Sequence, residues 1–471
     1  MAKKFYLTNA IPYVNGSPHL GHSLEFIISD VITRYHRLSG DNTLATCGSD
    51  ENGQKILEAA KKEGLKPQQL ADKNTDAFLK HLTQLNVSFD VWRRATDKKL
   101  HWPGVNKLWQ LCSKNGDIYK KTYQGLYCVG CEQFYTKNEL VDGKCPEHDR
   151  KPETVSEENY FFKLSKYQKQ LEELISSDKL QVLPQVRKNE TLGFIRQGLQ
   201  DFSVSRPAER LGNWGIPVPD DPSQVMYVWF DALTIYMTAI GWGYDDKLWQ
   251  KWWPADIHVI GKGIYRFHTV YWPAMLLSAG LPLPKNILVH GYVNSGGKKM
   301  AKSLGNVVDP KTLLKKYGTD PIRYYLLKEV PTQADGDFTE TRFKEIFNAD
   351  LANGLGNLVS RVAKLAETDG LSGIKEYSKK ITIADYIDRY EFNLALTKLW
   401  EEVRNLDLEI SRFAPWEKSA ADRKGRLVEY AKKILALAWQ LQIFLPETAE
   451  KIAKVFTGNK IKLDNPLFPR L

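Results

Sequence analysis

The sequence contains few cysteines and no long apolar run, and both shortages limit what the protein can be. No stretch approaches the roughly 18 apolar residues that a membrane-spanning helix needs. The chain turns polar at Thr8 and Asn9, before the apolar core of a signal peptide can form. Repeats of fixed period and low-complexity tracts are also absent. We therefore expect a cytoplasmic protein that has no membrane partner.

The five cysteines are unevenly placed along the chain. Cys128, Cys131 and Cys145 lie in one short segment, whereas Cys47 and Cys112 stand alone among apolar residues. An odd number distributed in this way is unsuited to a disulfide framework. The pattern favours metal binding in a reducing compartment.

The composition is that of a folded globular protein. Hydrophobic residues make up 42% and charged residues 26% of the 471 residues, which excludes a disordered chain. At roughly 150 residues per domain, this length predicts two to four domains and excludes one small binding module. Lys and Arg number 66 against 56 for Asp and Glu, and the net charge of +10 favours a polyanionic partner.

The N-terminal part has the order of a parallel α/β unit. A short apolar strand is predicted over residues 4–9, a helix with one apolar face over 20–38, and a second strand over 43–47. Strand, helix and strand in this order form a right-handed parallel unit, whose ligand crevice lies beyond the carboxyl ends of the strands. His19 and Asp50 follow these strands and are expected at that crevice.

The rest of the chain predicts an inserted segment and a terminal bundle. From about Gly116 short aromatic strands prevail (119–127), followed by a helical stretch (164–174), and then buried strands return at 225–229, 257–260 and 287–290. After about Phe347 the pattern is helical, over 351–365, 387–408 and 427–444. The fold class is therefore α/β: a Rossmann-like parallel-sheet domain, split by an insertion, with an all-α bundle after it. The expected boundaries are 1–115, 116–224, 225–346 and 347–471.

Two histidines three residues apart, His19 and His22, open the first predicted helix. Imidazoles at a helix N-terminus can face an anion, because the backbone N–H groups and the dipole already favour negative charge there. Gly21 leaves room for a flat base close to the backbone. Nucleotidyl transfer requires such donors at the α-phosphate. The alternative is a helix that merely begins with two histidines.

A glycine-bracketed basic loop spans residues 296–306, just after the strand that ends at His290. Its lysines can clamp a triphosphate, since lysine is a mobile point charge that follows a leaving pyrophosphate. The flanking glycines would allow the loop to close. The alternative is a solvated basic turn.

The cysteine segment has the spacing of a zinc knuckle. Cys128-x2-Cys131 is followed, thirteen residues later, by Cys145-x2-His148. Three thiolates and one imidazole form a closed tetrahedral set, which predicts one structural Zn²⁺ without an open catalytic position. The alternative is reduced structural cysteines with a nearby surface histidine.

The histidine and lysine motifs lie at opposite ends of one predicted parallel-sheet domain, where their loops can meet. This pair resembles the two signature motifs of class I aminoacyl-tRNA synthetases. Five further segments narrow the resemblance to the methionyl-tRNA synthetase family, and they are residues 9–16, 158–162, 227–232, 253–262 and 348–353. The resemblance extends from the first strand to about Trp416, weakening towards its end.

The resemblance implies a ligase that activates L-methionine with Mg²⁺-ATP and transfers it to the 3′ end of tRNA(Met), releasing AMP and diphosphate. Its catalytic residues would be His19, His22, Lys299 and Lys302. ATP would also contact Gly21, Gly261, Val293 and Ser303. The segment that carries the zinc knuckle corresponds to an inserted domain of the family. No dimerisation module is evident, and we expect a monomer.

The methionine side chain needs an aromatic pocket, because a thioether is apolar and polarizable. The sequence offers aromatic side chains near strand ends, at Tyr13, Trp229, Tyr236, His268 and Trp272. The resemblance places these in the pocket with Ala10, Ile11, Ala232 and Ile264, and assigns Asp50 to the substrate ammonium group. For each aromatic residue taken alone, core packing is the commoner explanation.

The helical C-terminal region should read the anticodon if the resemblance holds. Splayed RNA bases need aromatic platforms and amides, with cations along the backbone. The candidates are Trp400, Arg404, Asn405, Arg412 and Trp416. The alternative is helix packing by the tryptophans and a solvated charged face.

Several positions depart from the family pattern. Asp407 stands where the family has an asparagine, and Gly263 stands where it usually has an aspartate. The other departures are Ala301 for serine, Leu233 for proline and Asn52 for histidine. Gly263 removes a carboxylate from the crevice, where it would hold the ribose or the substrate amine, and we expect shifted details in the pocket.

Rival functions share some of these motifs. Synthetases for leucine, isoleucine or valine carry a large editing domain, for which the segment between about Gly116 and Val225 is too short. A cysteine-specific synthetase has an open zinc position in its active site, unlike this closed ligand set. A tRNA-binding protein derived from such an enzyme would have lost the histidines or lysines, and all four are present.

Overall fold

The computed structural model describes residues 3–130, 133–135, 139–146, 149–300 and 308–471. Its internal contacts define two compact units. The first comprises Met1–Pro18, Asp41–Lys80 and Phe89–Val289, and the second comprises His19–Gly40, His81–Ser88 and His290–Leu471. The predicted division into four domains stays a prediction.

The first unit contains the predicted parallel sheet. Its six strands lie in the order β3 (Val91–Arg94), β2 (Asn42–Ser49), β1 (Lys4–Asn9), β12 (Ile257–Gly261), β13 (Asn286–His290) and β7 (Gln181–Leu183). β1 pairs in parallel with β2 and β12, and β13 pairs in parallel with β7. β1 is buried from its second residue onward, including the apolar Phe5, Tyr6 and Leu7 and the polar Thr8 and Asn9. The parallel α/β class is thereby confirmed.

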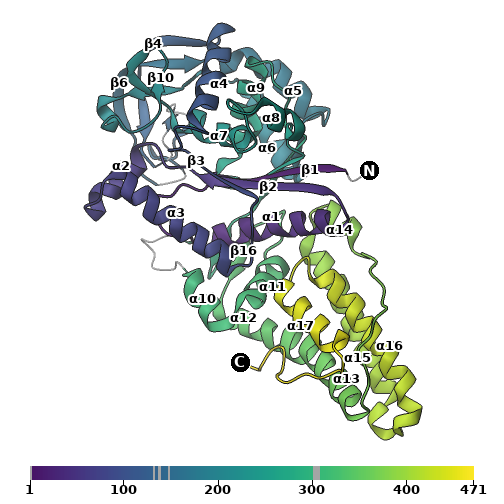
Figure 1. The fold of residues 1–471 in the computed structure, drawn as a ribbon. Helices are drawn as coiled ribbons and strands as arrows, with labels where there is room; N and C mark the ends of the chain where they lie inside the picture. The colour runs from purple at the N-terminus through teal and green to yellow at the C-terminus, as the bar shows by residue number, and fades with distance from the viewer. Residues whose placement is uncertain (1–2, 131–132, 136–138, 147–148, 301–307) are drawn as a thin grey trace. The chain divides into compact units, whose positions relative to one another are not determined.

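Helices gather on one face of this sheet, as Figure 1 shows for α4 (Trp102–Lys114), α7 (Val228–Thr238), α8 (Asp246–Trp252) and α9 (Trp272–Ser278). α7 contacts β2 and β3, and α8 contacts β1. α4 approaches α7 closely at Gly104, where a Cβ would lie 2.4 Å from the Thr238 methyl carbon. The close packing fixes α7, which carries several predicted pocket residues.

The strand predicted over 225–229 is wrong in its second half. The observed strand, β11 (Asp221–Met226), ends at Met226. It pairs antiparallel with β9 (Ser205–Pro207) and β10 (Pro217–Val218) in a small separate sheet. α7 starts at Val228, so Trp229 lies on a helix. The apolar run around Tyr227 is short, and periodicity alone cannot distinguish a buried strand from a buried helix in such a run.

The segment predicted as an insertion forms an antiparallel sheet. Its order is β5 (Gln133–Tyr135), β4 (Ile118–Cys128), β6 (Glu153–Phe162) and β8 (Phe202–Ser203). Between β6 and β8 lie α5 (Gln168–Ser176), β7 and α6 (Gln185–Arg196). β7 is the edge strand of the parallel sheet, which the sequence did not predict. Its three residues are too few to produce a recognisable alternation.

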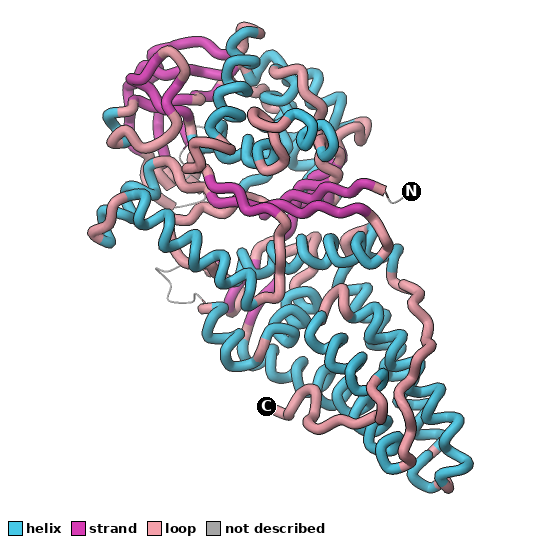
Figure 2. Tube along the Cα trace, in the orientation of Figure 1, coloured by secondary structure: helices cyan, strands magenta, loops and turns pink. Residues whose placement is uncertain are grey.

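The second unit contains α1 (Leu20–Leu38), a small sheet and the C-terminal helices. β14 (Val293–Ser295) pairs with β15 (Lys298–Lys299) and with β16 (Gly336–Phe338). The helices are α10 (Pro310–Tyr317), α11 (Thr319–Glu329), α12 (Glu340–Ile346), α13 (Asn357–Thr368), α14 (Ala384–Asp388), α15 (Phe392–Phe413), α16 (Ala420–Leu441) and α17 (Pro446–Thr457). Figure 2 shows that helices and loops make up the chain beyond α12, so the predicted helical C-terminal region is confirmed.

One predicted helix of this region is two helices. The helix expected over 387–408 is broken between α14 and α15, where Tyr390 has a φ of 57°. A residue in the left-handed region cannot continue a right-handed helix. Within the described residues, no helix is both long and apolar enough to span a membrane.

Candidate functional site

His19 and His22 cap the N-terminus of α1 reciprocally. The His19 Nδ1 accepts a hydrogen bond from the His22 backbone N–H at 3.4 Å, and the His22 Nδ1 accepts from the His19 N–H at 3.2 Å. Their rings stack with centroids 3.7 Å apart. Because both Nδ1 atoms act as acceptors, each neutral ring carries its proton on Nε2. The helix terminus therefore presents two imidazole N–H donors beside the positive end of its dipole.

Gly21 is required by this arrangement. A Cβ at Gly21 would lie 3.1 Å from the His19 ring atoms, closer than side chains normally pack. The absent side chain thus leaves room for the His19 imidazole itself.

The surroundings of His22 keep its ring neutral. Burial, with smaller contributions from His19, His81 and His290, holds the pKa of His22 well below its usual value. Burial also lowers the pKa of His81 to about 4, and its Nε2 lies 2.8 Å from the Ser23 hydroxyl. On the next turn of α1, Glu25 lies 3.1 Å from the His290 Nε2. The second unit thus gathers four histidines around the start of α1.

The lysine loop begins as a β-hairpin. Gly296 and Gly297, both with positive φ, form the two-residue turn between β14 and β15. The Gly297 N–H donates to Asp337 Oδ1 at 2.9 Å, so this turn is anchored. Val293 is buried on β14. Lys302, Ser303 and Ala301 lie outside the described residues, as does the side chain of Lys299.

An aromatic cluster forms in the first unit from α7, α9 and the residues before α9. Trp229 stacks on Phe267 with centroids 3.9 Å apart, and lies edge-on to His268 at 6.2 Å. The Tyr236 ring lies 5.7 Å from His268 and 6.3 Å from Trp272. Four of the five predicted pocket aromatics are therefore brought together. Trp229 is half-buried, whereas Tyr236, His268 and Trp272 are buried.

Hydrogen bonds fix the tautomer of His268. Its Nδ1 lies 3.0 Å from the Ile264 carbonyl oxygen, which can only accept, so Nδ1 carries the proton. Nε2 then accepts from the Tyr236 hydroxyl at 2.7 Å. Burial lowers the pKa of His268 to about 4, so the ring is neutral at pH 7. The cluster is therefore an uncharged, polarizable surface of the kind a thioether needs.

The remaining pocket candidates lie at the ends of the parallel strands or on α7. Ala10 follows β1, is buried, and donates its N–H to Val259. Ala232 is buried on α7, and Ile11 and Ile264 pack against the main core of the first unit. Gly261 ends β12, and Gly263 just beyond it is exposed.

Tyr13 and Asp50 belong to adjoining segments that pair as an isolated parallel bridge. The Tyr13 hydroxyl donates to the Asn52 carbonyl at 2.7 Å, and Asp50 is buried. The Asn52 amide donates to the Asp231 carboxylate at 2.5 Å. Asp231 in turn lies 2.6 Å from the His101 Nε2. This buried network joins the loop of Asp50 to α7, and no sequence motif indicated it.

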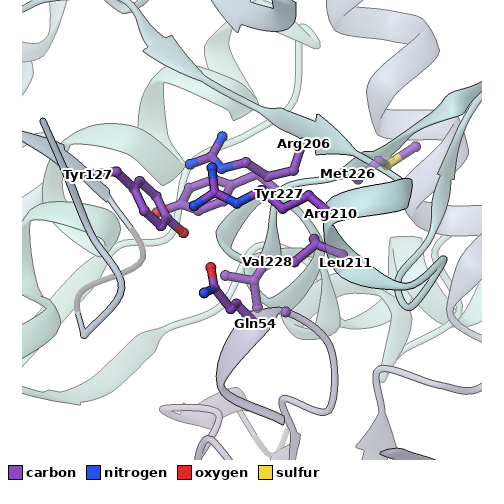
Figure 3. Close-up of a pocket in the computed structure, with 9 residues that line it drawn as sticks. Gln54, Tyr127, Arg206, Arg210, Leu211, Met226, Tyr227 and Val228 are labelled. Atoms are coloured by element: carbon purple, nitrogen blue, oxygen red, sulfur yellow. The ribbon is translucent and has the colours of Figure 1, made fainter. Parts of the chain in front are cut away.

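Sequence reasoning also missed a small cationic pocket beside this network. Figure 3 shows the guanidinium groups of Arg206 and Arg210 beside the rings of Tyr127 and Tyr227. Arg206 lies over Tyr227 at 4.6 Å, and Arg210 lies over Tyr127 at 5.0 Å. The wall is completed by Gly53, Gln54, Leu211, Met226 and Val228. Arg210 also forms an ion pair with Glu157, so the charge of this pocket is partly neutralised by the protein.

Two of the four predicted zinc ligands can be placed. Cys128 and Cys145 are both buried in one small cluster with Tyr135. The Cys145 thiol lies 3.5 Å from the Tyr135 hydroxyl, and neither cysteine forms a disulfide. Cys131 and His148 lie outside the described residues, so no group of three metal-binding side chains occurs within the described part of the chain.

The predicted anticodon residues have different environments. Trp416 is 48% exposed, and the Arg361 guanidinium lies over its ring at 4.9 Å. Arg361 also pairs with Asp407 at 2.6 Å, which neutralises the unexpected acid. Arg404, Asn405 and Arg412 are exposed. Trp400 is buried and its indole N–H donates to the Asp350 carbonyl, which argues against base stacking on this residue.

Comparison with known sequences gives consistent matches. A family model described as tRNA synthetases class I (M) matches residues 5–151 and 140–363. The methionine–tRNA ligase of Thermotoga maritima is 38% identical over 95% of this chain and 74% of the relative. The methionine–tRNA ligase of Thermosynechococcus vestitus is 41% identical over 100% of this chain and 93% of the relative.

Solved structures of methionyl-tRNA synthetases have a fold similar to that of this chain. The Mycobacterium tuberculosis methionyl-tRNA synthetase bound by methionyl-adenylate has a TM-score of 0.92 and 35% identity to this chain, over 99% of this chain and 100% of that one. The apo form has a TM-score of 0.85 at 33% identity, over 100% of this chain and 99% of that one.

Proposed function

Because this chain belongs to the class I tRNA synthetases of the methionine type, we propose how its residues carry out the reaction of that family. The reaction is the ligation of L-methionine to tRNA. ATP and methionine first form methionyl-adenylate and diphosphate, and the methionyl group then passes to the 3′ end of tRNA(Met) with release of AMP. The chain is an aminoacyl-tRNA synthetase, a ligase, with methionine, ATP and tRNA as its partners.

In the first step the methionine carboxylate attacks the α-phosphate of Mg²⁺-ATP in line. His19 and His22 donate from Nε2 to the phosphate oxygens, and Lys299 and Lys302 draw off the diphosphate. The reciprocal capping of the two imidazoles carries this proposal, because it fixes two donors at a helix N-terminus before substrate arrives. ATP also contacts Gly21, Gly261, Val293 and Ser303.

Methionine is held by the aromatic cluster and by the loop of Asp50. The thioether lies against Trp229, Tyr236, His268 and Trp272, where the neutral His268 and Tyr236 offer polarizable ring edges. Tyr13, Ala10, Ile11, Ala232 and Ile264 complete the pocket. Asp50 receives the substrate ammonium group.

In the second step a ribose hydroxyl of the terminal adenosine attacks the adenylate carbonyl. The bond between the carbonyl carbon and the phosphate oxygen then breaks, and AMP leaves. The ribose hydroxyl is the nucleophile, so no protein nucleophile is needed. Trp416, Arg404 and Asn405 contact the anticodon, with Trp416 as the stacking platform. The four-part division at residues 115/116, 224/225 and 346/347 separates these tasks.

One structural Zn²⁺ is held by Cys128, Cys131, Cys145 and His148. The burial of two of these thiols in one cluster fits such a closed site. The ion would stabilise the fold of this segment, and elemental analysis should find about one zinc per chain. Less than about half an equivalent would contradict this assignment. We also expect a monomer in the cytoplasm, a compartment where cysteines stay reduced.

A double substitution tests the catalytic assignment. His19→Ala combined with Lys302→Ala should abolish methionine-dependent exchange of labelled pyrophosphate into ATP, because both the donor and the clamp are removed. The affinity for tRNA should remain nearly intact. Exchange that survived the double substitution would show the assignment to be wrong.

A further inference from the structure

A basic groove lies on the surface of the helical region, between α16 and the loop that follows α13. Figure 2 shows the segment between α13 and α14 as one long loop running beside α16. The groove has a volume of about 420 Å³. It is lined by Gly370, Leu371, Ser372, Gly373, Ile374, Lys375, Glu376, Lys424, Val428 and Lys432.

Three lysines line this lysine groove against a single acid, Glu376. Lys424 and Lys432 are two turns apart on α16 and lie on the same stripe of the helix. Lys375 stands on the loop, and all three are exposed. None of the three forms an ion pair within the described part of the chain. Three lysines against one glutamate leave the lining of the groove with a net positive charge.

The loop wall of the lysine groove is fixed by its packing. Leu371 and Ile374 are buried, and the Ile374 N–H donates to the Phe456 carbonyl at 2.7 Å. Gly373 passes so close to Gly458 that a Cβ would lie 2.0 Å from its carbonyl oxygen. With these residues pinned inward, Ser372 and Lys375 remain exposed. The groove is thus preformed, so less conformational entropy of the protein is lost when a ligand binds.

One arginine joins the lysine groove to the exposed Trp416. Arg423 on α16 forms a bidentate pair with Asp369, at 2.6 and 2.8 Å, where the groove loop begins. The same guanidinium donates to the Pro415 carbonyl at 3.2 Å, in the turn Pro415–Glu417 that carries Trp416. Arg423 therefore holds both the turn that carries Trp416 and the start of the loop that forms one wall of the groove.

We propose that the lysine groove binds the phosphate backbone of the RNA strand that leads to the base stacked on Trp416. This proposal rests on the proposed function, which supplies tRNA as the partner. An RNA strand with a splayed base needs an aromatic face and, along its backbone, a row of mobile cations. Lysines serve this purpose as point charges without base specificity.

The test compares two double variants that lose the same charge. Lys424→Gln with Lys432→Gln removes two groove cations. Lys433→Gln with Lys454→Gln is the matched control, because both of those lysines are exposed and paired elsewhere, with Glu409 at 2.5 Å and Glu450 at 2.6 Å. The probe is an RNA hairpin carrying the methionine anticodon loop, titrated at several salt concentrations. Thermal unfolding of each variant checks its fold.

The variant with Lys424→Gln and Lys432→Gln, the groove double, should bind the hairpin roughly tenfold more weakly at about 0.1 M salt. The slope of the logarithm of its binding constant against the logarithm of the salt concentration should become shallower by about 1.4 to 1.8. The loss should be the same for a hairpin with an altered anticodon, since phosphate contacts carry no sequence information. The control double should change affinity less than about twofold. Equal losses in both doubles, or no loss in the groove double, would overturn the proposal.

Failure of the proposed function itself has a different signature. The parent chain would then show no methionine-dependent pyrophosphate exchange, whatever the hairpin affinities of the two doubles.

Discussion

At the scale of single residues, hydrogen-bond partners decide which ring nitrogen of each histidine carries the proton. The capping bonds occupy Nδ1 of His19 and His22, and leave the N–H donor on Nε2. His268 has the opposite tautomer, because its Nδ1 faces the Ile264 carbonyl. One residue type thus supplies donors at the helix terminus and an acceptor in the aromatic cluster.

The roles of the two ring nitrogens of His22 can be tested separately with a matched pair of variants. His22→Asn keeps an acceptor near the Nδ1 position and loses the Nε2 donor, so pyrophosphate exchange should fall by roughly 10²–10³-fold with little change in stability. His22→Gln keeps a donor near Nε2 and loses the cap, so it should retain more activity and lose about 1 kcal/mol of stability. Exchange kinetics and thermal unfolding measure both. An asparagine variant as active as the glutamine variant would contradict the donor role.

The pH dependence of stability should reflect buried neutral His268. Burial places its pKa at about 4 in the folded chain, below the ordinary value near 6.5, so the unfolded chain binds the proton first as the pH falls. His268 alone should therefore lower stability between about pH 6.5 and pH 4, by roughly 2 kcal/mol from pH 7 to pH 5, and His22 and His81 should add losses of the same sign. Urea unfolding at the two pH values measures this loss. His268→Gln should reduce it, and an unchanged loss in that variant would contradict the assignment.

At the scale of elements, α7 is held in place by polar contacts that join it to distant segments. Asp231 lies between Asn52 and His101, and His101 also contacts the Thr238 hydroxyl at 2.8 Å. The network connects the loop after β2, the start of α4 and α7. Because Trp229, Ala232 and Tyr236 all lie on α7, its position sets the shape of the aromatic cluster.

Asp231→Asn should therefore weaken methionine binding, although Asp231 is not one of the proposed methionine contacts. The charge-assisted bond to His101 is lost, at a cost of roughly 1.5–3 kcal/mol of stability. The KM for methionine should rise more than the KM for ATP, because the proposed methionine pocket includes residues of α7 and the proposed ATP contacts do not. Steady-state exchange kinetics with each substrate varied in turn measure the two values. Asp246→Asn, which removes an exposed acid that pairs with Lys107, is the control. Equal increases of both KM values would contradict this positioning role.

The sequence predicted the bounds of two N-terminal elements correctly. β1 and α1 were predicted at their observed bounds because their patterns are unambiguous. The start of α7 at Val228 was assigned to a strand, because a short apolar run does not distinguish strand from helix, and the three-residue edge strand β7 was missed. The Asp231 network and the stacking of Arg361 on Trp416 join residues far apart in the chain, and no local pattern indicates them.

At the scale of the whole molecule, stability in the second unit depends on one buried arginine. Arg323 on α11 is fully buried, and its guanidinium reaches Asp30 on α1 at 2.7 Å. It also donates to the Phe444 carbonyl at 2.7 Å and the Leu85 carbonyl at 3.1 Å. The helix that carries His19 and His22 is thereby tied to the C-terminal helices.

Arg323→Met should destabilise the chain by roughly 2–5 kcal/mol, because the buried carbonyls of Phe444 and Leu85 lose this donor and Asp30 keeps only its pair with Arg34. Arg342→Met provides the comparison, since Arg342 is 53% exposed and its pairs with Glu329 and Glu345 should contribute no more than about 1 kcal/mol. Urea unfolding of the two variants measures the difference. Similar small losses in both would contradict the role assigned to Arg323.

The measurement that tests the central claim most directly is amino-acid-dependent exchange of labelled pyrophosphate into ATP. Methionine, cysteine, leucine, isoleucine and valine are compared in parallel, and no tRNA is needed. The neutral aromatic cluster and the capped histidine pair predict exchange with methionine alone. Exchange with none of the five, or with another of them in preference to methionine, would contradict the account.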